Sequence, residues 1–179
     1  MKHSESPARN RRAPARPRPR LLAALACTAL VGLGWNASAT AFEPEAKVVY
    51  HVDYGDPQRL SSMLTSINNM MTHYQNEFMD VDVRVVFMSD GIRFATDDNL
   101  EETPFEVDAE FQEERDELRT RLSGLHQTHG VKYELCDITR TRVRLDASDV
   151  HGNVDLVPSG VVRLAELQND KGFAYIKID

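Results

Sequence analysis

Cysteine is scarce in this sequence, and several familiar motifs are missing from it. Only two of the 179 residues are cysteines, Cys27 and Cys136. The sequence has no glycine-rich phosphate-binding loop, no nucleophile elbow and no closely spaced pair of cysteines. These absences argue against a P-loop nucleotide-binding protein, a hydrolase built on a nucleophile elbow and a zinc site built on cysteine pairs.

Long apolar runs are missing too. The longest, Leu21 to Trp35, has 15 residues, whereas a membrane-spanning helix needs about 20. A basic segment precedes this run and Ala37-Ser38-Ala39 follows it, which is the order of a cleavable signal peptide. We therefore expect residues 1–39 to be removed and residues 40–179 to form one periplasmic domain without a membrane anchor. An uncleaved anchor is the alternative.

The predicted cleavage changes both the charge and the cysteine content. It would remove seven of the 21 basic residues and one of the 28 acidic ones, which leaves a mature domain with 14 basic and 27 acidic residues and a formal charge of −13. Such a charge argues against nucleic acid and anionic membrane surfaces as partners. Cys136 would be the only cysteine left. An unpaired cysteine in an exported protein is either a small buried hydrophobe or a thiol kept for its reactivity.

Short β-branched segments alternate with helical segments along the mature domain. Asp56-Pro57 is a helix-start signal, Gly130 is a helix-end signal, and Thr103-Pro104-Phe105-Glu106 matches the capping box of a second helix. We expect the methionines of the first helix to pack in the core and the Glu- and Arg-rich face of the second to be solvated. The alternation predicts an α/β three-layer sandwich around a mostly parallel sheet of about five strands. Strands are predicted at 47–52, 81–88, 131–136, 154–157 and 173–178.

Chemically useful side chains lie on these strands or just after them. Ligands bind outside the carboxyl ends of the strands in open parallel sheets. Cys136 ends the third strand, His51 lies on the first and Asp90 follows the second. Positive charge from Arg140 and Arg142 would favour the thiolate of Cys136, and His51 or Asp90 would assist proton transfer. An inert Cys136 and a buried, hydrogen-bonded His51 are the structural alternatives.

His126 and His129 are three residues apart near the end of a predicted helix. This spacing allows shared metal ligation, but no third ligand is evident nearby. Histidine near a helix C-terminus also suits the helix dipole. The sequence therefore predicts neither a metal site nor a cofactor.

Several segments, taken in order, match a known pattern: 47–52 with Asp56-Pro57, Asp90-Gly91, 130–136, 157–161 and 175–177. Together they resemble the DsrE/DsrF-like family over nearly the whole mature domain. The resemblance implies a flavodoxin-like DsrE/F fold, assembly as a trimer or hexamer, and a cysteine just after a central strand that carries sulfur as a persulfide. Cys136 matches that position, and Arg140 to Arg144 lie where members often have a basic loop. The acidic stretch from Asp97 to Glu117 is not typical of compact members.

The leading hypothesis is a periplasmic sulfur carrier or sulfurtransferase-like protein that holds persulfide sulfur on Cys136. Its partners would be further copies of itself and sulfur donor and acceptor proteins. The alternative is a non-catalytic oligomeric binding protein with the same fold, in which Cys136 is merely packed. The reactivity of the thiol separates the two hypotheses.

Overall fold

The computed structural model describes residues 43–179, and the predicted signal peptide lies outside this range. The central sheet has five strands in the order β4-β3-β2-β1-β5, and every neighbouring pair is parallel. The prediction of an α/β fold with a mostly parallel sheet of about five strands is confirmed. The strands are β1 (Ala46–Val52), β2 (Val81–Phe87), β3 (Lys132–Cys136), β4 (Val154–Val157) and β5 (Ala174–Ile176).

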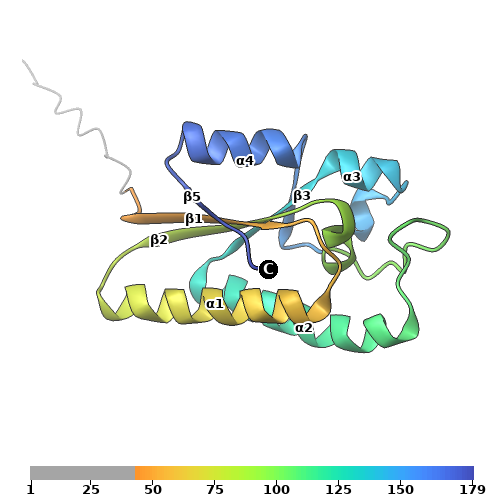
Figure 1. Ribbon diagram of the computed structural model, residues 1–179, viewed down its shortest axis with the longest axis horizontal. Helices are drawn as coiled ribbons and strands as arrows, with labels where there is room; N and C mark the ends of the chain where they lie inside the picture. Colours follow the sequence, from red (N-terminus) through yellow and green to blue (C-terminus); the bar gives the residue numbers. More distant parts are fainter. Residues whose placement is uncertain (1–42) are drawn as a thin grey trace, which may run out of the picture. The chain divides into compact units, whose positions relative to one another are not determined.

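The helices cover the two faces of the sheet unequally (Figure 1). The chain steps from β1 to β4 in one direction, and right-handed crossovers then place α1 (Pro57–Asn76) and α2 (Ala109–His129) together on one face. The return from β4 to β5 reverses the direction, so α4 (Gly160–Asn169) lies on the opposite face. Three shorter elements complete the domain: η1 (Ser89–Phe94), α3 (Asp137–Arg142) and η2 (Ala147–Asp149). No helix within residues 43–179 is both long and apolar enough to cross a membrane.

Two of the predicted helix boundaries are confirmed. The Asp56 side chain caps α1 by accepting hydrogen bonds from the backbone N–H groups of Gln58 and Arg59, at 2.8 and 3.1 Å. Pro57 occupies the first turn, where its missing N–H costs nothing. At the other boundary, α2 ends at Gly130, whose φ of 68° is left-handed.

The predicted capping box at 103–106 is wrong, because α2 begins later. Its N-cap is Asp108, whose Oδ1 accepts the N–H of Phe111 at 2.8 Å. Thr103 instead closes a turn: its Oγ1 donates to the carbonyl of Leu100 at 2.6 Å and accepts the N–H of Phe105 at 3.1 Å.

Burial explains why the helix starts late. Phe105 and Val107 are both buried in the main core. The turn at 103–106 and the irregular backbone that follows it place both side chains in this core, whereas a helix would turn two residues this far apart to different sides. Tertiary packing therefore overrides the local capping signal.

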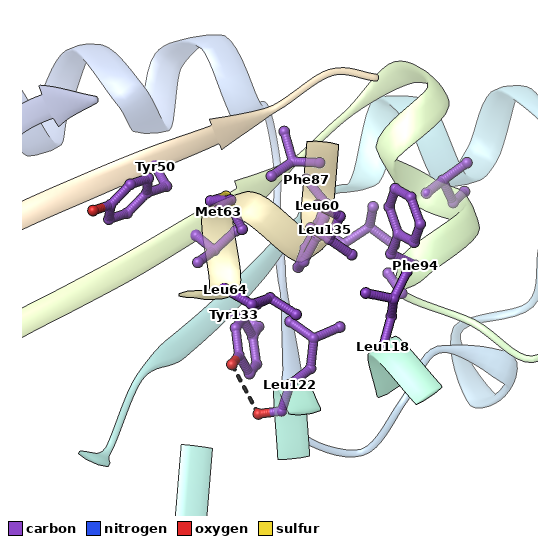
Figure 2. Close-up of a cluster of buried hydrophobic side chains, with 14 of the residues drawn as sticks. Tyr50, Leu60, Met63, Leu64, Phe87, Phe94, Leu118, Leu122, Tyr133 and Leu135 are labelled. Atoms are coloured by element: carbon purple, nitrogen blue, oxygen red, sulfur yellow. Dashed lines mark hydrogen bonds between the residues drawn. The ribbon is translucent and has the colours of Figure 1, made fainter. Parts of the chain in front are cut away.

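The face covered by α1 and α2 holds the main core (Figure 2). The methionines of α1 contribute to it as predicted, with Met63 and Met71 both buried. Tyr133 of β3 is buried as well, and its hydroxyl donates to the carbonyl of Leu122 in α2 at 2.8 Å. That hydrogen bond satisfies a polar atom inside an otherwise apolar layer.

The buried face of α2 contains a charged residue, Arg115, between Phe111 and Leu118. This side chain is only 1% exposed, and burial lowers its pKa. It donates to the carbonyls of Asp97 and Asp98, both at 2.8 Å, and to Asn99 Oδ1 at 3.2 Å. Arg115 therefore ties the start of the acidic stretch to α2.

Candidate functional site

Cys136 is the last residue of β3 and the N-cap of α3. Its neighbour across the sheet is Val157, the last residue of β4. The chain leaves β3 for α3 and leaves β4 for α4, so Cys136 lies at the carboxyl edge of the sheet, beside the starts of both helices. Such points at the carboxyl edge of a parallel sheet are where ligands bind.

The side chain of Cys136 lies on the α4 face and is only 6% exposed. It belongs to a second, smaller apolar cluster that packs α4 onto the sheet. The other members are Val49, Val86, Met88, Leu164, Leu167 and Phe173.

The first turns of α3 and α4 both lie beside Cys136. Burial raises the pKa of the thiol, but the N–H groups of Gly160, Thr139 and Ile138 and the Thr139 hydroxyl outweigh that effect, so the pKa lies below its ordinary value. The Cys136 side chain makes no cap hydrogen bond at the start of α3. Polar N–H and O–H groups near a sulfur stabilise the thiolate more than the neutral thiol.

Thr139 connects this site to the end of β2. Its buried Oγ1 accepts the N–H of Ser89 at 3.1 Å, which leaves its proton free to face the sulfur. Ser89 has a left-handed φ of 51°. The predicted site residue Asp90 follows it in η1 and is half-buried. The Ser89-Asp90-Gly91 segment is therefore joined to α3 through the hydrogen bond from Ser89 to Thr139.

Gly160 is a site residue that the sequence did not single out. A Cβ at this position would lie 2.5 Å from Met88 Cε and 3.1 Å from Cys136 Cβ. Only glycine lets the first turn of α4 approach the cysteine this closely. The resemblance in the Val-Pro-Ser-Gly segment was the available signal, and its physical meaning is this close approach.

Arg140 and Arg142 are placed differently from the backbone donors. The Arg140 Nε donates to Asp137 Oδ1 at 2.6 Å, and its Nη1 donates to the Leu145 carbonyl at 2.5 Å. Arg142 is exposed in the last turn of α3. Backbone N–H groups and one hydroxyl thus account for the lowered pKa of Cys136, and a thiolate-stabilising role for the two arginines stays a prediction.

His51 belongs to a neighbouring cluster on the same face of the sheet. It pairs with Val86 of β2, so β2 separates it from the strand that carries Cys136. Its Nδ1 lies 3.0 Å from the hydroxyl of Tyr175, and its Nε2 lies 3.9 Å from Asp53 Oδ2. Burial lowers the pKa of His51, although Asp53 opposes that shift. Proton transfer between His51 and Cys136 stays a prediction.

The two histidines near the end of α2 have separate partners. His126 Nδ1 donates to the carbonyl of Val131 at 2.9 Å, and His129 Nδ1 lies 3.0 Å from Gln75 Nε2. Within residues 43–179, no group of three or more His, Cys, Asp or Glu side chains is arranged to hold a metal ion.

Within residues 43–179, the fold and the site together define a small parallel α/β domain with one buried free thiol at the carboxyl edge of its sheet. The model of the DsrE/DsrF-like family matches residues 46–178, and the chain belongs to this family. Membership relates it to the sulfur-relay proteins and confirms the resemblance drawn from the sequence.

Two solved structures are similar to this chain, and the first of them shares its fold. MTH1491 from Methanobacterium thermoautotrophicum, a protein of unknown function, is 23% identical with a TM-score of 0.56, and the match covers 74% of this chain and 99% of MTH1491. The ychN protein of E. coli is 16% identical with a TM-score of 0.45, over 74% of this chain and 99% of that protein. No curated protein matches at a significant level.

Proposed function

We propose that the protein is a periplasmic sulfur carrier that holds sulfane sulfur on Cys136 as a persulfide. Family membership supports sulfur chemistry in general. The observation that carries the proposal for this chain is the position of Cys136 at the carboxyl edge of the sheet, beside the first turns of α3 and α4, where neighbouring polar groups lower the pKa of its thiol. A merely packed cysteine needs no such polar groups, and burial alone would raise the pKa of its thiol.

The proposed reaction is a transfer of sulfane sulfur from a donor persulfide, R–S–SH. The Cys136 thiolate attacks the outer sulfur of the donor and forms a new S–S bond. The donor S–S bond breaks, and R–S⁻ leaves with the electron pair. The product is Cys136–S–SH, so atoms and charge balance without an external oxidant or reductant. Release to an acceptor thiolate is the same step in reverse.

Compartment and assembly are further parts of the proposal. The signal-peptide pattern in residues 1–39 supports export to the periplasm. The family resemblance supports self-association as a trimer or hexamer, with separate proteins as sulfur donor and acceptor. His51, Asp90, Arg140 and Arg142 remain candidates for proton transfer and anion stabilisation around Cys136.

The reactivity of the thiol tests the proposal. Because the pKa of Cys136 is lowered, the native protein is expected to react with iodoacetamide faster than a free cysteine peptide at mildly acidic pH. The rate should be followed against pH on the mature chain by intact mass. The same chain unfolded in urea is the control, and its profile should move to higher pH. A thiol that reacts only after unfolding would contradict the proposal and favour the non-catalytic binding protein.

A further inference from the structure

A buried ion pair lies directly behind Cys136 on the α4 face of the sheet. Glu134 precedes Cys136 by two residues on β3 and is only 3% exposed. Arg163 of α4 grips this carboxylate with two nitrogens: Nε lies 2.6 Å from Oε2, and Nη2 lies 2.7 Å from Oε1. Arg84 of β2 donates to the same carboxylate from the side, with Nη1 2.8 Å from Oε1.

The spacing of these residues joins α4 to β3 at two points. Residues two apart on a strand share a face, and residues three apart on a helix lie on one side of it. Gly160 meets Cys136, and Arg163, three residues later, meets Glu134, two residues earlier. The pairing is the one expected when α4 runs back along β3, as crossover helices do in parallel sheets.

A contribution to the stability of the fold does not by itself explain why Glu134 and Arg163 form a buried ion pair. Taking two charges out of water costs much of what their attraction returns, and apolar replacements of similar volume are often equally stable. Leu164 and Leu167 already hold α4 against the sheet by apolar packing. A bidentate pair between a guanidinium and a carboxylate fixes the orientation of α4 on the sheet, which apolar packing alone does not.

We infer that the Glu134–Arg163 pair positions the first turn of α4 so that the Gly160 amide faces the sulfur of Cys136. The inference rests on the proposed function, because it assigns a purpose to the placement of that donor. Glu134 and Arg163 are positioning residues here, since they act on the thiol only through α4. Burial raises the pKa of Glu134, but the donors on Arg163 and Arg84 outweigh it, so the carboxylate stays ionised and the grip stays intact.

The inference is tested by substituting lysine for each of the two arginines that bind the Glu134 carboxylate. Arg163→Lys keeps the positive charge but loses the two-nitrogen grip from α4. It is expected to move the alkylation profile of Cys136 to higher pH by about one unit, the effect of losing one hydrogen bond to a charged group. Arg84→Lys is the matched control: it changes the same ion pair from β2, leaves α4 untouched, and should leave the profile unchanged. Equal profiles for Arg163→Lys and the wild type, or equal shifts in both variants, would overturn the inference.

Glu134→Gln gives an independent test, because its two possible effects on the pKa of the Cys136 thiol have opposite signs. Removing a negative charge near the thiol would by itself lower the thiol pKa, whereas releasing α4 raises it. The positioning role therefore predicts a shift to higher pH, and a shift to lower pH would contradict it. Circular dichroism checks that each variant is folded. Sulfur uptake by the wild type tests the proposed function separately, because the alkylation profiles report on positioning even if no sulfur is taken up.

Discussion

Gly160→Val is expected to lower the alkylation rate of Cys136 at mildly acidic pH by about ten-fold or more. The added side chain would enter space held by Met88 Cε and Cys136 Cβ, at 2.5 and 3.1 Å from the first added carbon. The tip of Met88 can move, but Cys136 Cβ is fixed by β3, so the first turn of α4 must retreat. Losing one hydrogen bond to a charged group, about 1.5 to 3 kcal/mol, raises the thiol pKa by about one to two units.

The neighbouring substitution Val161→Ala provides the control for Gly160→Val. Val161 occupies the same turn of α4, but its side chain is 68% exposed. It should leave both the alkylation profile and the fold unchanged. If Gly160→Val keeps the wild-type rate while remaining folded, the Gly160 amide does not act on the sulfur, and the account of the lowered pKa fails.

Gly91→Ala is expected to destabilise the domain by about 3 kcal/mol, at the upper end of the range for overpacked sites. A Cβ on Gly91 would lie 2.3 Å from the carbonyl oxygen of Val52 and 3.0 Å from Val52 Cγ1. The nearest atom belongs to the backbone of a central strand, so no rotamer change relieves the clash. Displacing η1 would also move Ser89, whose N–H holds the Thr139 hydroxyl beside the sulfur.

Urea unfolding at a fixed protein concentration measures the effect of Gly91→Ala. Gly124→Ala is the matched control, because Gly124 is exposed in the middle of α2 and an added Cβ meets nothing within 4 Å. The control should be neutral or stabilise the domain by up to about 1 kcal/mol, since alanine favours a helix more than glycine does. Equal unfolding midpoints for the two variants would show that the approach of Gly91 to Val52 carries no strain.

The sequence predicted the parts of this fold that depend on local chemistry. Asp56 and Gly130 mark helix ends through their own capping geometry, and the β-branched segments form the five strands. The failures arose where distant contacts decide. The start of α2 depends on the burial of Phe105 and Val107, and the placement of Arg115 depends on carbonyls far from it in the sequence.

The same distinction holds for the candidate site. The position of Cys136 at the end of a strand was predictable, because the residue pattern of 131–136 indicates where that strand ends. The donors around its sulfur were not, since Gly160 and Thr139 reach it only through the packing of α4 and α3. Arg140 was chosen for its proximity to Cys136 in the sequence, and its guanidinium binds Asp137 in the same helix. Its role toward the thiolate stays a prediction.

The most direct test of the central claim is the intact mass of the protein, produced as residues 40–179, after exposure to a polysulfide donor. The account predicts that the wild type gains the mass of one sulfur atom per chain and loses it again on reduction. Cys136→Ser should gain nothing while keeping its fold, because a hydroxyl differs little in size from a thiol. A wild-type protein that gains no sulfur, or a Cys136→Ser variant that gains as much as the wild type, would contradict the account.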